Sequence, residues 1–225
     1  GVVPEEPNAP PDMTTEELVN FCSKLYKNWD NKNVQSRLQK FSIATKTRFG
    51  QLSKGQKCQV MLALALGHSP DLLVLDDPTL GLDVVARREF FEEVIGELAD
   101  NGITILITTH DLPGIENIAS HVGILKNGSL MVNEEMEVLK SKFRRIRYTG
   151  RGGQVAHNYT GELEPMSALD ITVGHWGIEA VVSDFDDKRF DRLRMLEGLT
   201  EPEVVAMSLE EIFATVVSER TPSKK

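Results

Sequence analysis

The stretch Leu72-Leu73-Val74-Leu75-Asp76-Asp77-Pro78 decides the fold predicted from this sequence of 225 residues. Its apolar residues form a short continuous run bounded by Pro70 and Asp76, which is typical of a parallel strand covered on both faces. An acid pair at the carboxyl end of such a strand lies where α/β folds bind their ligands. One carboxylate can hold Mg²⁺ while the other orients or deprotonates an attacking water. Taken alone, the stretch fits a strand that ends in a solvated Asp-Asp-Pro turn equally well.

Helices and strands alternate on the carboxyl side of this stretch. The predicted elements are a helix over 84–100 with Phe91, Val94, Ile95 and Leu98 on its apolar side and Asn101-Gly102 at its end, a second buried strand over 103–107, a short helix near 112–119, and strands over 122–126 and 129–132 joined by an Asn127-Gly128 turn. This alternation is the pattern of a parallel sheet with crossover helices, so we expect an α/β fold.

Three helices are predicted on the amino-terminal side, after a Pro-rich extended segment. The first begins with a capping box of Thr14 and Glu17, and its apolar stripe consists of Leu18, Phe21, Cys22 and Leu25. The second covers residues 30–40, and we expect Val34, Leu38 and Phe41 to face inward. The third opens at Ser53 and is apolar nearly all round, so it is predicted to be buried.

The last third of the chain is predicted to be a small α+β region. Within residues 143–148, three arginines are interspersed with apolar residues. A turn is predicted after them at Gly150, Gly152 and Gly153. A final helix, capped by Ser208 and Glu211, carries a stripe of Leu209, Ile212, Phe213 and Val216, and a polar tail starts at Ser218. The expected divisions are 1–50, 51–140 and 141–225.

A second motif, Leu52-Ser53-Lys54-Gly55-Gln56, opens the third helix. Ser53 and Gln56 have capping-box spacing, so a well-capped helix is the simple interpretation. Gly55 suggests a binding role in addition, because glycine in a helix lowers stability by about 1 kcal/mol relative to alanine. It lets another group approach the bare N–H donors at the positive helix end, and phosphate suits that place.

Two more motifs follow the acid pair: the tight loop Thr79-Leu80-Gly81-Leu82-Asp83 and the strand end Thr108-Thr109-His110-Asp111. A lone histidine is more often structural than catalytic. His110, however, is predicted at the same sheet edge as the acid pair, where it can act as a phosphate sensor. The other four histidines lack such a context and are interpreted as surface or packing residues.

Composition narrows the class of protein. The 34 acidic and 25 basic residues give a net charge of −9, which speaks against nucleic acid as a partner, because neutralising phosphates needs clustered Lys and Arg. The two cysteines, Cys22 and Cys58, fit a reducing compartment rather than a disulfide framework. The longest apolar run, 60–66, is far shorter than the ~20 residues that cross a bilayer. We expect a soluble cytoplasmic protein.

In combination, these motifs resemble the nucleotide-binding domain of ATP-binding cassette (ABC) proteins from about Pro4 to Asn133. They occur in that family's order, as signature Leu52–Gln56, Walker B Leu72–Asp77, D-loop Leu80–Asp83 and switch histidine His110. The resemblance implies a partial P-loop NTPase (RecA-like) core with the ABC helical subdomain, plus a C-terminal appendage like that of bacterial exporter subunits. Glu5 lies where the family's loop usually carries glutamine.

The resemblance also implies roles for the residues near the predicted sheet edge. Asp76 would bind Mg²⁺, Asp77 would be the general base that polarises water, and His110 would hold the γ-phosphate of ATP. Asp77 stands where the family usually has glutamate, one methylene longer. General-base effects are worth ~10²–10⁴ in rate, so a poorly placed base would leave a slow or inactive site.

Partners follow from the same resemblance. Ser53, Gly55 and Gln56 would close over ATP held by a second nucleotide-binding subunit, and Asp83 would link the two sites of a head-to-tail homo- or heterodimer. Lys54 replaces the usual first glycine of the signature pair. The helical subdomain would face integral membrane subunits, so the protein would be peripheral on the inner face of the cell membrane.

No G-x-x-x-x-G-K-[ST] occurs in the sequence, although that loop cradles the phosphates in this family. Two explanations stay open: the residues are a fragment of a longer subunit, which the missing initial Met favours, or the protein is a degenerate relative. The main hypothesis is an ATPase subunit of an ABC exporter. The alternatives are a non-catalytic module that completes a partner's ATP site, and a soluble ABC ATPase acting on ribosomes or DNA, which the acidic composition disfavours.

Overall fold

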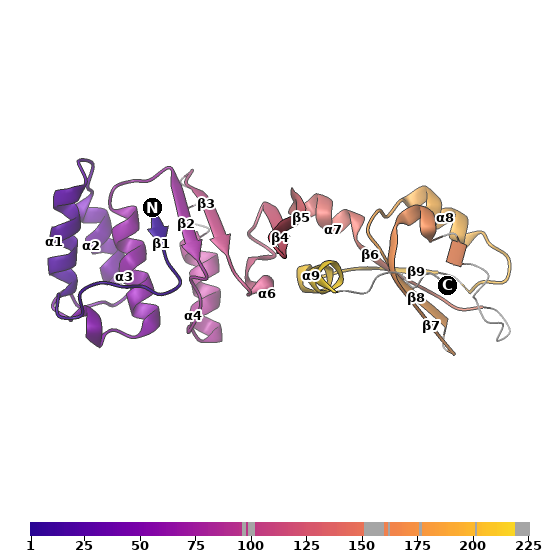
Figure 1. Cartoon of the computed structure of the whole chain (residues 1–225), viewed down its shortest axis with the longest axis horizontal. Helices are drawn as coiled ribbons and strands as arrows, with labels where there is room; N and C mark the ends of the chain where they lie inside the picture. Colours follow the sequence, from indigo (N-terminus) through magenta and orange to yellow (C-terminus); the bar gives the residue numbers. More distant parts are fainter. Residues whose placement is uncertain are drawn as a thin grey trace. The chain divides into compact units, whose positions relative to one another are not determined.

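A computed structural model describes residues 1–218 except 96–97, 99–101, 151–159, 162, 176 and 201. Its helices and strands are drawn in order in Figure 1. The chain divides into two compact units, Gly1–Ile118 and Ala119–Lys225. The divisions expected near residues 50 and 140 stay predictions.

Three helices open the first unit, as predicted: α1 (Thr15–Leu25), α2 (Asn31–Lys40) and α3 (Lys54–Leu66), with the 3₁₀ turn η1 (Phe49–Gln51) before α3. The predicted capping box of Thr14 and Glu17 is present at α1. The stripe predicted for α1 is partly wrong, because Phe21 and Leu25 are 56% and 62% exposed while Val19 is buried. The buried face of α1 is turned toward Thr15 and Val19, where the core shared with α2 and α3 lies.

A parallel sheet forms the centre of the first unit, with strand order β1 (Val2–Val3), β2 (Leu72–Asp76), β3 (Thr104–Thr108). The parallel pairing predicted for the two later strands is confirmed, with Leu73 beside Ile105 and Leu75 beside Ile107. The start of the chain, predicted as an extended loop, contributes the edge strand β1.

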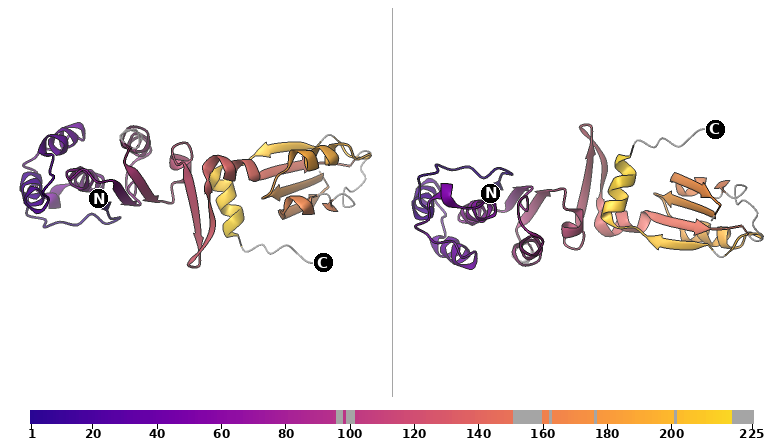
Figure 2. Two further views of the ribbon diagram at one scale, coloured as in Figure 1. Left: turned by 90° about the horizontal axis from the view of Figure 1, so that it is seen from above. Right: turned by 90° about the horizontal axis from the view of Figure 1, so that it is seen from below.

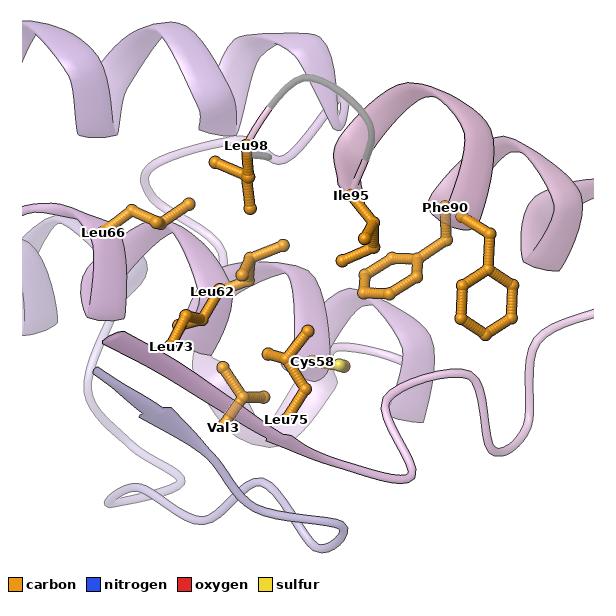
Figure 3. Close-up of a cluster of buried hydrophobic side chains, with 10 residues drawn as sticks. Val3, Cys58, Leu62, Leu66, Leu73, Leu75, Phe90, Ile95 and Leu98 are labelled. Carbon is orange, nitrogen blue, oxygen red and sulfur yellow. The ribbon is translucent and has the colours of Figure 1, made fainter. Parts of the chain in front are cut away.

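One face of this sheet carries the core, as Figure 3 shows. Leu73 and Leu75 point toward the apolar side chains of α3 and of the helical segment that follows residue 84, and the cluster includes Leu62 and Phe90. The prediction that both strands are covered on both faces is wrong for the described residues. Leu106 is 56% exposed, because both helical segments pack on the face that carries Leu73.

The helix predicted over 84–100 consists of α4 (Val84–Glu89) and a π-helical segment, η2 (Phe90–Ile95). Phe91, Ile95 and Leu98 are buried, as predicted. The side chain of Val94 and residue Asn101 lie outside the described parts of the structure. The next helix, α6 (Leu112–Ile115), is shorter than the predicted 112–119.

The second unit begins with a hairpin of β4 (His121–Lys126) and β5 (Ser129–Glu135). Asn127 and Gly128, both with positive φ of 50° and 77°, form the predicted turn. The expectation that 122–126 adds a third parallel strand after 103–107 is wrong for the described residues. β4 pairs antiparallel with β5 in a sheet of its own, which Figure 2 shows joined through α7 to the rest of the unit.

The remainder of the second unit is the predicted α+β region, an antiparallel sheet of order β7-β8-β6-β9 with helices. Its elements are α7 (Met136–Lys142), β6 (Arg144–Tyr148), η5 (Glu164–Met166), β7 (Ala168–Gly174), β8 (Gly177–Val182), α8 (Asp187–Arg194), β9 (Glu203–Ala206) and α9 (Leu209–Val217). Phe213 is more exposed than its predicted stripe implies. Gly152, Gly153 and the tail after Ser218 lie outside the described residues. Within those residues, no helix has the length and apolar character needed to cross a bilayer.

Candidate functional site

The acid pair lies at the carboxyl end of β2, against the end of β3. Asp76 is paired in register with Thr108, whose hydroxyl donates a hydrogen bond to the Asp76 carboxylate. Asp77 follows with a φ of 42°, a left-handed conformation that aspartate tolerates better than most residues. Its backbone N–H donates to the carbonyl of Thr108 at 2.9 Å. Both acids are therefore held by the strand that leads to His110.

His110 meets Asp77 directly. Its Nδ1 lies 2.8 Å from Oδ2 of Asp77, with the histidine side chain 67% exposed and the aspartate 15% exposed. The hydroxyl of Thr109 donates to the other carboxylate oxygen of Asp77 at 3.4 Å. The structure thus brings together three residues chosen from sequence, Asp76, Asp77 and His110, at one edge of the sheet. Their chemical roles stay predictions.

The signature residues form the amino-terminal cap of α3. The backbone N–H of Gln56 donates to Oγ of Ser53 at 3.2 Å, and the N–H of Ser53 donates to Oε1 of Gln56 at 3.0 Å. Gly55 is buried, and a Cβ there would lie 2.5 Å from Cδ2 of Leu82. The group that comes close to Gly55 in this structure is therefore the leucine of the D-loop. The exposed end of α3 is formed by Ser53 and Lys54.

Two further contacts join α3 to the loop after the acid pair. The methylenes of Lys54 lie beside Gly81, whose φ is 85°. The thiol of Cys58 donates a hydrogen bond to the carbonyl of Pro78 at 3.2 Å. Burial raises the pKa of that thiol to about 11, so it keeps the proton that it donates at neutral pH. The D-loop and the first turns of α3 therefore pack directly against each other.

Arg87 and Asp111, for which no role was predicted from the sequence, extend this arrangement. Nη2 of Arg87 donates to the carbonyl of Leu82 at 3.4 Å, and its Nε lies 3.4 Å from Oδ2 of Asp111, which is 10% exposed. The N–H of Asp111 donates to Oγ1 of Thr109 at 2.9 Å. A polar chain thus runs from the D-loop to the residues that flank His110. In the sequence, this polar chain was signalled only by the acidic residue Asp111 that follows His110.

The remaining candidates lie on the exposed surface. Asp83 precedes α4, where its carbonyl accepts from the N–H of Arg87 at 2.9 Å. Glu5 is exposed in the segment after β1. Among the described residues, no group of three or more histidine, cysteine or acidic side chains is arranged to hold a metal ion. The exposed carboxylate of Asp76 fits Mg²⁺ as a single ligand, since Mg²⁺ commonly uses one or two carboxylates with waters and substrate phosphates.

Comparisons with known proteins show what the chain is similar to. A family model described as "AAA domain, putative AbiEii toxin, Type IV TA system" matches residues 9–115. The ABC transporter ATP-binding protein YtrB of Bacillus subtilis is 30% identical over 134 residues, which are 60% of this chain and 46% of YtrB. A fluoroquinolones export ATP-binding protein of Mycobacterium tuberculosis is 32% identical over 159 residues, 68% of this chain and 52% of that protein. The chain therefore spans about half the length of these curated relatives.

A solved structure shares the fold. It is a dimeric ATP-binding cassette in a post-hydrolysis state, bound to ADP and Pi, with a TM-score of 0.54 and 24% sequence identity. The match covers 60% of this chain and 62% of that one. The fold of the matched part is thus that of a partial P-loop NTPase core.

Proposed function

We propose that the natural gene product containing this chain hydrolyses ATP to drive transport by membrane-embedded partners. We place the direction of transport as export. The basis is that the chain is homologous in sequence and fold to the ATP-binding proteins of ABC transporters. The observation that carries this proposal is the pair of Asp77 and His110, 2.8 Å apart, beside Asp76 at one sheet edge. The fluoroquinolone exporter relative supports the direction.

Each residue of the pair has a distinct task in this proposal. Asp77 is the general base, and its two oxygens are oriented before substrate arrives by His110 and Thr109. A positioned base of this kind contributes ~10²–10⁴ in rate. His110, with most of its ring exposed, contacts the γ-phosphate. Mg²⁺ held at Asp76 would neutralise charge on the phosphates.

The signature residues serve a second nucleotide-binding subunit. Ser53 is exposed at the amino end of α3, where unsatisfied N–H groups and the helix dipole favour an anion. We place the ATP of the partner subunit there, with Asp83 at the interface between the subunits. The dimeric state of the cassette with the same fold supports this arrangement.

The membrane partner is assigned to the surface of α1. Phe21, Leu25 and Tyr26 are 56%, 62% and 46% exposed, and neighbouring large apolar side chains on a surface mark an interaction site. Contact there with integral membrane subunits would hold the protein at the inner face of the cell membrane. In this proposal, the surface is part of the helical subdomain that the resemblance implies.

A second candidate function is a non-catalytic module that lends Ser53–Gln56 to the ATP site of a competent partner. One observation favours it, namely aspartate rather than glutamate at position 77. In this case Asp76 and Asp77 would have no direct task in hydrolysis.

Phosphate release by the natural gene product with its partners distinguishes the two functions. Under the main proposal, Asp76→Asn and His110→Ala lower hydrolysis by ~10²-fold or more, and His110→Ala still pairs the subunits in the presence of ATP and Mg²⁺. The same rate in wild type and both variants, together with loss of hydrolysis in Ser53→Arg, would establish the second function instead. If the natural gene product together with its partners does not bind ATP with Mg²⁺, both functions are overturned.

A further inference from the structure

The position of His110 depends on the short segment that carries it from β3 to α6. Its ring is 67% exposed and meets Asp77 through Nδ1 at 2.8 Å. Because packing does not hold a ring that is mostly exposed, the backbone on either side sets its place. A residue that anchors this segment therefore determines whether His110 reaches Asp77.

The amino side of His110 is tied to the strand that carries the acid pair. Thr108 is paired in register with Asp76, and its carbonyl accepts from the N–H of Asp77 at 2.9 Å. The hydroxyl of Thr109 donates to Oδ1 of Asp77 at 3.4 Å. These contacts hold the chain in place up to the residue before His110.

The carboxyl side of His110 is anchored by Asp111. Its N–H donates to the hydroxyl oxygen of Thr109 at 2.9 Å, and its Oδ1 accepts from the N–H of Gly114 at 3.4 Å. Asp111 thereby closes the turn around His110 and caps α6. A Cβ at Gly114 would lie 2.6 Å from the ring of Phe91, so this turn is packed closely against a buried side chain.

Arg87 of α4 faces the second carboxylate oxygen of Asp111. Its Nε lies 3.4 Å from Oδ2, and both atoms are buried with no hydrogen-bond partner among the described residues. Each of these two charges therefore depends on the other to offset the cost of burial. Nη2 of the same guanidinium donates to the carbonyl of Leu82 at 3.4 Å. Its rigid fork of donors lets Arg87 make both contacts at once.

We propose that Arg87 and Asp111 are positioning residues for hydrolysis, because their ion pair holds His110 on Asp77. An ionised carboxylate only accepts hydrogen bonds, so in this arrangement the proton of the neutral ring lies on Nδ1. A misplacement of about 1 Å can lower a reaction rate ~10²-fold. The role in hydrolysis rests on the proposed function, whereas the placement of the ring does not.

Nuclear magnetic resonance of the purified chain tests the placement of the ring without ATP. ¹⁵N spectra at pH 8.5, above the ordinary imidazole pKa of about 6.5, report which ring nitrogen carries the proton. The signal that disappears in His110→Gln belongs to His110. We expect the proton on Nδ1 in wild type, and a mixture of both tautomers in Arg87→Met and in Asp111→Asn.

Asp111→Asn is the second variant in case Arg87→Met does not fold. The asparagine keeps an oxygen that can accept from the N–H of Gly114, as asparagine does at other helix caps, but it loses the charge that faces Arg87. It therefore separates the ion pair from the cap of α6.

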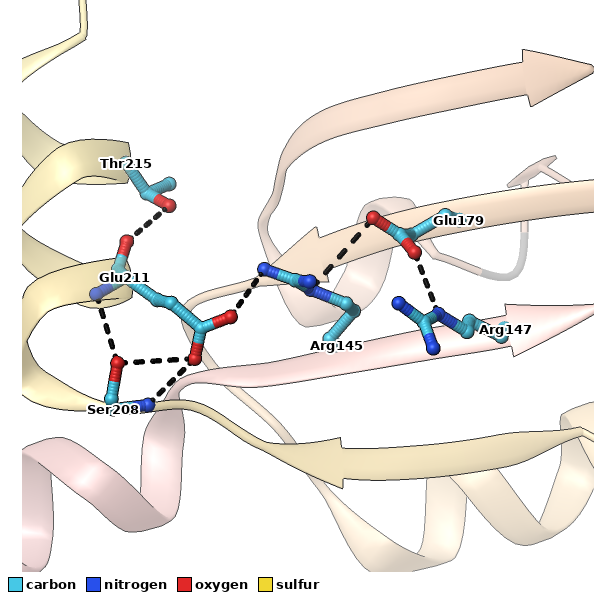
Figure 4. A network of polar contacts seen from close by, with 6 residues as sticks. All are labelled: Arg145, Arg147, Glu179, Ser208, Glu211 and Thr215. Carbon is cyan, nitrogen blue, oxygen red and sulfur yellow. Dashed lines mark hydrogen bonds and ion pairs between the residues drawn. The ribbon is translucent and has the colours of Figure 1, made fainter.

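Arg147→Met is the matched control. It breaks an ion pair of the same kind in the second unit, where Nε of Arg147 lies 2.6 Å from Oε2 of Glu179, as Figure 4 shows. The tautomer of His110 should not change in this variant. A proton on Nε2 in wild type, an unchanged tautomer in Arg87→Met and Asp111→Asn, or an equal change in Arg147→Met would overturn the proposal.

Phosphate release by the natural gene product with its partners tests the role in hydrolysis. Arg87→Met should lower kcat about tenfold, less than His110→Ala does, and should change the KM for ATP far less. Arg87→Lys, which keeps a cation beside Asp111, should restore part of the rate. No loss of kcat, or a change confined to KM, would overturn the positioning role. If His110→Ala itself has no effect, the proposed function fails, and the tautomer of His110 still decides the placement of the ring.

Discussion

Nδ1 of His110 lies 2.8 Å from Oδ2 of Asp77, although the two residues are 33 positions apart in the sequence. The parallel register of β2 and β3 brings the two residues together. It pairs Asp76 with Thr108, so the segments that carry Asp77 and His110 leave the sheet side by side. The positive φ of Asp77 then turns its carboxylate toward the loop after β3. A polar pair at the proposed ATP site thus follows from one strand pairing.

The first prediction concerns Asp77 as base. Asp77→Asn keeps the shape of the side chain but removes its ability to take a proton, so phosphate release by the natural gene product with its partners should fall ~10²–10⁴-fold. Asp71→Asn, an exposed acid just before β2, is the matched control and should retain the wild-type rate. If Asp77→Asn also retains it, Asp77 is not the base.

The second prediction concerns the contact between Arg87 and Asp111. Asp111→Ala leaves the half-buried guanidinium of Arg87 without the carboxylate 3.4 Å away, which should lower the free energy of unfolding by about 1–3 kcal/mol. Urea unfolding followed by Trp29 fluorescence in a Trp176→Phe background reports on the first unit. The double variant Arg87→Met/Asp111→Ala should lose less than the sum of the two single changes, and strict additivity would refute the coupling.

The third prediction concerns Cys58 and alkaline pH. Its pKa is raised by burial from 9.0 to about 11, so the folded state holds the thiol proton more tightly than the unfolded state does. The stability that this provides is complete below pH 9 and is lost as the pH rises through about 11. The free energy of unfolding of the first unit should therefore fall more steeply over this range in wild type than in Cys58→Ala. Parallel curves would contradict the assignment.

The same thiol should react slowly with a disulfide reagent in the native protein at pH 7.5, since the thiolate is the reactive species and Cys58 is buried. Cys22 is only partly buried and provides the internal comparison. Rapid labelling of both cysteines before unfolding would show that Cys58 is open to solvent.

The fourth prediction concerns the cap of α9. Ser208 accepts from the N–H of Glu211 at 3.2 Å and is the first half of a capping box. Ser208→Ala should lower the free energy of unfolding of the second unit by about 1 kcal/mol, measured by urea denaturation followed by circular dichroism. Ser141→Ala, at an exposed serine in α7, is the comparison at which we expect a smaller loss.

Much of the local structure was predictable from residues three or four positions apart. The caps of Thr14, Ser53 and Ser208 are recognisable from a hydroxyl residue followed by Glu or Gln, and all three boxes are present. Periodicity indicated the helices and the strands, and the positions of the acid pair and His110 at strand ends followed from them. These features are recognisable because each is encoded by residues only a few positions apart in the chain.

Burial was less predictable, because it depends on segments far away in the chain. Apolar spacing alone does not distinguish Phe21 from Val19 as the inward residue of α1, and only the packing of α2 and α3 selects Val19. Likewise, the apolar run of β2 does not reveal that α3 and the helical segment after residue 84 cover the same face of the sheet.

By itself, the sequence determined which motifs are present, their order, and the helices and strands that carry them, since each is encoded over a few neighbouring residues. Only the tertiary structure decided that Leu82 fills the space beside Gly55, that Arg87 reaches both the D-loop and Asp111, and that β5, β7 and α9 line one groove. The physical reason is that such contacts are made between side chains from separate elements. They exist only after strand register and helix packing have fixed the distances.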